Sequence, residues 1–230
     1  MIWILFLGTL SLSLWATWRV KSVYNRYHQG VVRSGVTGGE VAAEILHRTG
    51  IRDVEITYAD GMLGDHYDPL HKRLVLSSDN FHGRTPAALG VAAHECGHAI
   101  QHARGYQPLH WRMAAVGLTT YANYIVMFLP MLGLLTGLIT AWTGAVIMAA
   151  AWGVIMTFNL ITLPVEFDAS RRAKRVLAEF GFIAPGAEAT AVKRVLDAAA
   201  WTYVAAFITS LAYFLWHLLP LLLGGNRSRD

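Results

Sequence analysis

Charged side chains and cysteine are the two things that this sequence has little of. Only 15% of its 230 residues are charged and 54% are hydrophobic, whereas soluble domains carry about 25% charged residues. This composition excludes a disordered chain, a coiled coil and an ordinary cytosolic enzyme, and it indicates a membrane protein. The single cysteine, Cys96, excludes a disulfide within the chain and a zinc ribbon built from several cysteines.

The charges that are present occur in blocks, and long segments without any charge separate them. Roughly 20 helical residues span a hydrocarbon core about 30 Å thick. We therefore expect a mainly α integral membrane protein with four transmembrane helices and a small α+β domain on the cytoplasmic side. The expected spans are one helix in 1–18, two helices in 113–163 with a turn between Gly133 and Gly144, and one helix in 198–223.

The remaining segments are expected to be polar and to lie outside the bilayer. They are a cytoplasmic α+β segment over 19–112, a cytoplasmic helical segment over 164–197 and a tail over 224–230. Lys and Arg number 11 in 19–112 and 6 in 166–197 but only 2 in the tail. The positive-inside rule therefore places both polar segments in the cytoplasm and both termini outside.

The first apolar segment is expected to be an uncleaved anchor. In a signal peptide, positive charge precedes the apolar stretch and small residues mark a cleavage site. Here the positive charges Arg19, Lys21 and Arg26 follow the apolar stretch instead, and no such cleavage site is present.

Two helices with recognisable caps are predicted in 19–112. Thr37 and Glu40 have the spacing of a capping box, and Gly50 is placed to stop the helix that follows. Thr85 and Pro86 have the pattern of an N-cap followed by proline at the first helical position, which predicts a helix over 86–104.

Strands are predicted between these helices. Apolar and polar residues alternate over 54–58, and 73–76 has the pattern of a second short strand. The turn dipeptides Asp60-Gly61 and Asp68-Pro69 lie between them, so we expect a β-hairpin or a small meander. The strand over 73–76 could offer an edge to an extended peptide substrate.

The helix predicted over 86–104 carries the motif H-E-x-x-H at His94, Glu95 and His98. A helix turns about 100° per residue, so the two imidazoles project from one face and can bind one Zn²⁺. Glu95 is placed to accept a proton from water that the metal has acidified. This arrangement is typical of amide hydrolysis, whereas an amphipathic helix with solvent-facing histidines is the structural alternative.

A catalytic zinc ion needs a third protein ligand. A histidine at position 104 would complete the longer form of the motif, but that residue is Arg104. Glu166 is the main candidate, because it is the first charged residue after a long apolar block and follows Pro164, which is expected to end or kink the span. Asp168 is the alternative ligand.

Three stretches of the sequence resemble the YugP-type family of putative neutral zinc metallopeptidases. They are His94 to His102, Leu163 to Ala173 and Asp65 to Pro69. The resemblance covers nearly the whole chain and implies a membrane zinc protease, with His94, His98 and Glu166 as ligands and Glu95 as the base. The layout is also similar to HtpX-like and CAAX prenyl proteases, but Ser170 stands where their second motif has an aspartate.

Further polar residues are weaker candidates. Asp168, Ser170 or a residue elsewhere could orient the histidine ligands, and Arg171 or Arg172 could stabilise an oxyanion. His102 could touch substrate, although a polar helix face explains it as well. One further group could either form a second metal site or consist of solvated turn residues: Asp65, His66, Asp68 and His71. Cys96 is expected to be packed, and His217 to lie at a helix interface.

The sequence thus predicts a membrane-embedded zinc metalloendopeptidase with one catalytic Zn²⁺, acting on protein or peptide substrates at the cytoplasmic face of a bacterial membrane. One alternative is a zinc-binding membrane scaffold or regulatory protein without significant turnover. A small transporter or channel subunit is the other, but the expected spans lack the charged residues that such a protein needs. The basic stretches lack a nucleic-acid recognition motif, so no nucleic-acid partner is expected.

Overall fold

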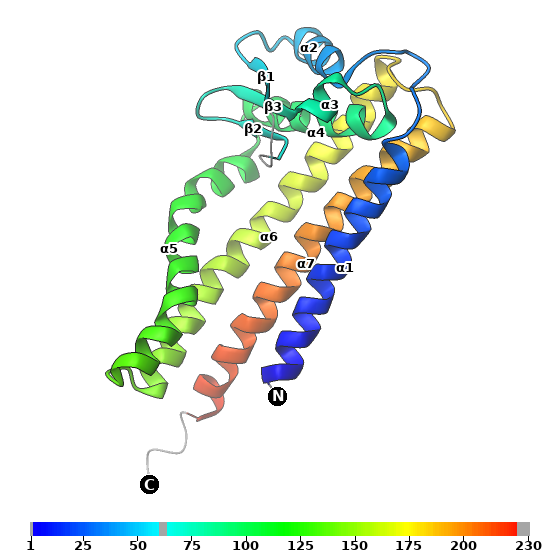
Figure 1. Ribbon diagram of the computed structural model, residues 1–230. Coiled ribbons are helices and arrows are strands. Elements are labelled where there is room, and N and C mark those ends of the chain that lie inside the picture. The colour runs from blue at the N-terminus through cyan, green and yellow to red at the C-terminus, as the bar shows by residue number, and fades with distance from the viewer. Residues whose placement is uncertain (1, 60–63, 225–230) are drawn as a thin grey trace. The chain divides into compact units, whose positions relative to one another are not determined.

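The structure is a computed structural model that describes residues 2–59 and 64–224. The chain is mainly helical, with one small sheet (Figure 1). In chain order the elements are α1 (Ile2–Tyr27), α2 (Gly38–Arg48), β1 (Glu55–Ala59), β2 (His66–Asp68), β3 (Arg73–Ser77), α3 (Ser78–His82), α4 (Pro86–Ala103), α5 (Gln107–Thr136), α6 (Ala141–Glu179) and α7 (Ala187–Gly224).

The chain divides into two compact units, and the four long helices α1, α5, α6 and α7 contribute to both. Unit 1 contains the chain up to Leu14, Trp111–Leu163 and the chain from Tyr203 onward. Unit 2 contains Trp15–His110 and Pro164–Thr202. Unit 2 therefore joins two segments that are far apart in the sequence.

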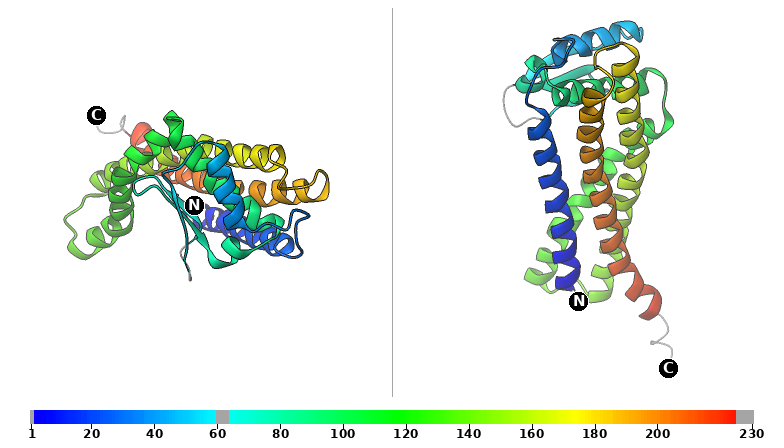
Figure 2. Two further views of the ribbon diagram at one scale, coloured as in Figure 1. Left: turned by 90° about the horizontal axis from the view of Figure 1, so that it is seen from above. Right: turned by 90° about the vertical axis from the view of Figure 1, so that its right-hand side faces the viewer.

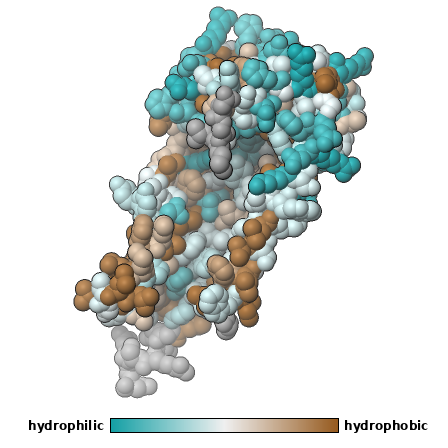
Figure 3. All heavy atoms as spheres, viewed as in Figure 1, coloured by the Kyte–Doolittle hydropathy of each residue, from teal (hydrophilic) through white to brown (hydrophobic). Residues whose placement is uncertain are grey.

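Unit 1 is built from helices. The helices α1, α5, α6 and α7 are long and apolar enough to be candidate membrane spans, which confirms the expected number of four. Their most apolar windows are only 6–22% buried, so most of their apolar surface faces outward, as lipid contact requires. Figure 2 shows them as long rods, and Figure 3 shows hydrophobic side chains gathered over α5 and α6.

The long helices differ from the expected ones at their ends. The turn between α5 and α6 lies at 137–140, as predicted. The helix α1 continues to Tyr27, beyond the expected end at residue 18. Pro164 does not end a helix, because α6 runs unbroken to Glu179. Proline is tolerated inside membrane helices when neighbouring groups satisfy the freed carbonyl, and Pro130 lies inside α5 in the same way.

The sheet in unit 2 has the strand order β1-β3-β2. A hairpin forms between β2 and β3, which pair antiparallel across the turn that starts at Asp68-Pro69. The expectation that 54–58 pairs with 73–76 as a hairpin is wrong in direction, because β1 and β3 are parallel. The intervening strand β2 reverses the chain, so β3 again runs in the direction of β1. Because β3 is central, the expectation that 73–76 offers a sheet edge is also wrong. Asp60-Gly61 lies outside the described residues.

The core of unit 2 lies between the sheet and its helices. Leu74 and Leu76 point from β3 into a cluster that contains Ile45 of α2, Leu89 of α4 and Leu177 of α6, all fully buried. The predicted caps are present. Thr37 and Glu40 form the reciprocal capping box of α2, and the Thr85 side chain accepts a hydrogen bond from the amide of Ala88 at 3.1 Å. The helix α4 is therefore held at its start and along its buried face.

Candidate metal centre

The motif residues lie in the second half of α4, where most of the helix is buried. His94 and His98 are one turn apart on one face, and their ring centroids are 4.8 Å apart. Side chains at i and i+4 of a helix lie one above the other, which explains this placement. The helix α4 by itself thus supplies two adjacent imidazoles.

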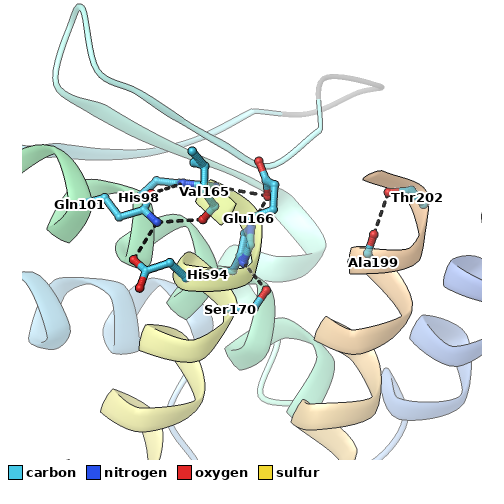
Figure 4. Close-up of polar contacts among 9 residues, drawn as sticks. His94, His98, Gln101, Val165, Glu166, Ser170, Ala199 and Thr202 are labelled. Carbon is cyan, nitrogen blue, oxygen red and sulfur yellow. Dashed lines mark hydrogen bonds and ion pairs between the residues drawn. The ribbon is translucent and has the colours of Figure 1, made fainter. Parts of the chain in front are cut away.

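The helix α6 supplies the third side chain, and a glycine allows it to come close. A Cβ atom added at Gly97 would lie 2.7 Å from the carbonyl oxygen of Ala169, nearer than such atoms ever approach. Only glycine therefore permits this helix contact. It brings Glu166, which is 1% exposed, beside both histidines (Figure 4). Glu166 Oε2 lies 3.2 Å from His94 Nε2 and 3.6 Å from His98 Nε2.

The three side chains have the geometry of a metal site. Their ligand atoms all lie within 4.8 Å of one another, and this is the one such group of three or more among the described residues. Ligand atoms about 2.0–2.1 Å from a tetrahedral Zn²⁺ lie about 3.3–3.4 Å from each other. The two distances from Glu166 match that spacing. Two imidazoles and one carboxylate are also a donor set that suits Zn²⁺ with one position left open.

Electrostatics within the site favour positive charge beside Glu166. Burial lowers the pKa of His98, but the hydrogen bond and charge of Glu166, with the charge of Glu95, outweigh burial and leave that pKa above its usual value. The carboxylates of Glu166 and Glu95 thus create a negative field at His98. A divalent cation satisfies the same negative field.

The ring nitrogens that face away from Glu166 also have partners. His94 Nδ1 lies 3.2 Å from Ser170 Oγ, and His98 Nδ1 lies 3.0 Å from Gln101 Oε1 (Figure 4). Gln101 is fully buried, and its amide nitrogen donates to Val165 O at 2.8 Å and to Asp168 at 3.0 Å. Because both amide hydrogens are used, Gln101 Oε1 must accept the hydrogen bond from His98.

Glu95 is buried but is not engaged by other side chains. It is 7% exposed, and it makes no hydrogen bond or ion pair to the parts of the chain that the structure describes. A buried carboxylate normally has partners. Its carboxylate oxygens are therefore available to a molecule that enters the site, such as water.

Asp168, the alternative third ligand, does not join the cluster. It accepts hydrogen bonds from Gln101 and from Arg172, the latter at 2.5 Å, and it pairs with Arg171 at 3.4 Å. The arginines proposed to stabilise an oxyanion are thus both ion-paired with Asp168. Hydrogen bonds connect Asp168 to Gln101 and Gln101 to His98, so Asp168 is connected to His98 through Gln101.

The remaining candidates lie outside the cluster. His102 Nδ1 is 2.9 Å from the hydroxyl of Tyr67, and burial, followed by the charge of His110, lowers the pKa of His102. His217 Nδ1 contacts the carbonyl of Tyr213 in unit 1 at 2.8 Å. Cys96 is fully buried, and burial raises the pKa of its thiol, so it has no thiolate character.

The turn residues Asp65, His66, Asp68 and His71 do not converge on a common point. Asp65 accepts hydrogen bonds from the amide of Ser77 and the side chain of Asn80. Asp68 accepts from the amides of Leu70 and His71 and from the His71 ring. These side chains therefore stabilise the turn.

The fold and site together define a helical membrane-type protein with a candidate metal centre. A family described as "Putative neutral zinc metallopeptidase" matches residues 2–222. "Putative membrane protease YugP" of Bacillus subtilis (strain 168) is 39% identical over 225 residues, which is 97% of this chain and 98% of that protein. No solved structure matches the chain significantly. The chain therefore belongs to the putative neutral zinc metallopeptidase family, which confirms the resemblance seen in the sequence.

The sequence reasoning missed Gln101 as a functional candidate. A signal was available: residue 101 is three positions after His98, so both lie on one helix face. The carbonyl of Val165, which fixes the Gln101 amide, could not be foreseen, because it depends on how α4 packs against α6.

Proposed function

We propose that this chain is a membrane-embedded zinc metalloendopeptidase that hydrolyses peptide bonds of protein substrates. The observation that carries this proposal is the convergence of His94, His98 and Glu166 beside the unengaged carboxylate of Glu95. Three protein ligands around one zinc ion leave a fourth position for water or substrate, as catalytic zinc sites require. A purely structural zinc site has four protein ligands and needs no free carboxylate beside it.

Each residue of the site then has one role. His94 Nε2, His98 Nε2 and one oxygen of Glu166 hold the zinc ion. When bound, the ion supplies Lewis-acid chemistry that acidifies water and polarises the scissile carbonyl. Glu95 accepts the proton of the attacking water and delivers it to the nitrogen of the leaving amine. Burial of Glu95 excludes competing bulk water from this transfer.

Gln101 and Ser170 act as positioning residues for the two imidazoles. By accepting the Nδ1–H of His98, Gln101 leaves the lone pair of His98 Nε2 for the zinc ion that the site would hold. Ser170 Oγ is the corresponding hydrogen-bond partner of His94 Nδ1. Hydrogen-bond partners of this kind fix the tautomer and orientation of metal-ligating histidines.

We further propose that the site faces the cytoplasm, with both termini outside. This orientation rests on the excess of Lys and Arg in 19–112 and 166–197. A reporter fused near residue 185 should be active as a cytoplasmic fusion, and one fused after Asp230 should be active as an external fusion. The opposite pattern would reverse the orientation without affecting the metal site.

The test of the enzymatic function is Glu95→Gln, which keeps size and polarity but removes the proton acceptor. Zinc content should be unchanged, while casein hydrolysis by the purified protein falls by at least about two orders of magnitude, the usual contribution of a general base. Glu55→Gln, at an exposed position in β1, is the matched control and should keep full activity. Full activity of Glu95→Gln would refute the role of the base. Stoichiometric zinc without any hydrolysis in the wild type would favour the scaffold alternative.

A further inference from the structure

A cavity in unit 2 is lined by arginines and shares no residue with the metal cluster. Its volume is about 290 Å³, and it lies where α2, α4 and α6 meet. Arg48, Arg104, Arg172 and Arg175 line it, and Glu179 is the one acidic residue in the lining. The four guanidinium groups outnumber the three carboxylates that pair with them, so the cavity carries a net positive charge that an anion relieves.

Three of these arginines are held in the same way, through Nε and a carboxylate. The distances are 2.6 Å from Arg48 to Glu44, 2.5 Å from Arg172 to Asp168 and 2.7 Å from Arg175 to Glu179. Their terminal Nη groups donate no hydrogen bond to any described residue. The carboxylates thus anchor each guanidinium at one edge and leave its two terminal nitrogens available to a ligand.

Aromatic rings fix two of the guanidinium planes. Arg48 lies 5.0 Å from the ring centroid of Phe180, and Arg172 lies 5.8 Å from that of Tyr106. These contacts reduce the side-chain entropy that ligand binding would otherwise cost. The side chain of Arg104 makes no ion pair or hydrogen bond within the described ranges, so its whole guanidinium is available.

We propose that this cavity binds a phosphate group. Pairs of terminal guanidinium nitrogens match the oxygen spacing of a phosphate and bind it in a bidentate manner. The volume, just below the range usual for drug-sized ligands, suits one phosphate with a small substituent. That phosphate is either a free anion or the headgroup of a phosphate-monoester lipid. The site does not depend on zinc or on the proposed hydrolysis.

The test uses the full chain in phosphatidylcholine nanodiscs, titrated calorimetrically with inorganic phosphate at an ionic strength held constant with chloride. The double variant Arg48→Gln/Arg104→Gln should bind phosphate at least about tenfold more weakly, because each charge-assisted hydrogen bond contributes that much or more. Arg73→Gln is the matched control, since Arg73 is exposed like Arg48 and also pairs with a glutamate. The single variant Arg104→Gln leaves no carboxylate unpaired, because Arg104 makes no ion pair with a described residue. It therefore tests phosphate binding even if the double variant does not fold.

A second arm distinguishes the source of the phosphate. The protein is reconstituted with phosphatidic acid or with phosphatidylglycerol, and retained lipid is counted by native mass spectrometry. Selective retention of phosphatidic acid that Arg104→Gln abolishes, with inorganic phosphate competing, identifies a lipid headgroup. Phosphate binding without selective lipid retention identifies a free anion. Equal binding of both ligands by wild type, Arg104→Gln and Arg73→Gln would overturn the proposal, as would no binding of either by the wild type.

Discussion

Two groups of histidines and acids occur in unit 2, and only one of them forms a candidate metal site. The helix cluster consists of His94, His98 and Glu166, and the turn cluster consists of Asp65, His66, Asp68 and His71. Both have residue types that bind metals. In the helix cluster the ligand atoms converge within 4.8 Å, whereas the turn cluster forms no such group.

The difference lies in what else satisfies the side chains. In the turn cluster, backbone amides of the same turn bind the carboxylates: Asp68 Oδ1 accepts from Leu70 at 2.9 Å and from His71 at 3.2 Å. Asp residues in turns commonly do this. Glu166 instead lies on a helix whose own amides are engaged, so its carboxylate must find partners across the helix contact. In this chain the candidate metal site is therefore the cluster whose side chains are not satisfied by local backbone groups.

The largest expected effect comes from removing one imidazole from each cluster. His98→Ala should weaken zinc binding by more than about a hundredfold, beyond the range observed when only a supporting partner is lost. His71→Ala should leave the zinc affinity unchanged. Competition against a fluorescent zinc chelator measures both affinities. Equal losses in the two variants would show that the clusters do not differ as described.

Removal of the support behind His98 should have the next largest effect. Gln101→Ala should lower the zinc affinity by about 10–100-fold, because the imidazole loses the partner that fixes its tautomer. A Co²⁺-substituted sample should also show an altered ligand-field spectrum, which a merely less stable protein would not show. Gln107→Ala, at the exposed start of α5, serves as the control. An unchanged affinity in Gln101→Ala would remove the positioning role.

A methyl group at the helix contact should have the smallest of the three effects. Gly97→Ala should lower the free energy of unfolding by about 1–3 kcal/mol, because the new Cβ meets the backbone of Ala169. Gly117→Ala, in a helix with nothing within 4 Å, should instead stabilise by about 0.5–1 kcal/mol. Denaturant unfolding in detergent measures both. A stabilising Gly97→Ala would mean that α4 and α6 do not pack as tightly as described.

Local patterns allowed much of the fold to be predicted from the sequence. The caps at Thr37 and Thr85, the start of α4 at Pro86 and the four apolar helices all follow from residues close together in the chain. The parallel pairing of β1 with β3 was missed, because strand direction depends on β2, which lies between them in the sequence. Pro164 was expected to end or kink the span, and packing, not propensity, decides that α6 continues through it.

In the candidate site, too, only the features that depend on nearby residues could be predicted. The spacing of His94 and His98 fixes their proximity, since one helix turn separates them. Glu166 was the preferred third ligand and Asp168 stayed the alternative, because both follow the apolar block closely. The packing of α6 at Gly97 determines which of the two faces the imidazoles, and this contact spans more than seventy residues of sequence. The role of Gln101 depends on the same contact and could not be derived from local pattern.

The central claim is that His94, His98 and Glu166 bind zinc, and anomalous diffraction at the zinc edge tests it most directly. One peak should lie among the three side chains, with imidazole nitrogens at about 2.0–2.1 Å and a Glu166 oxygen at about 2.0–2.2 Å. Asp168 should remain bonded to Gln101. A peak in the turn cluster, a peak ligated by Asp168 instead of Glu166, or no peak in active protein would contradict the account.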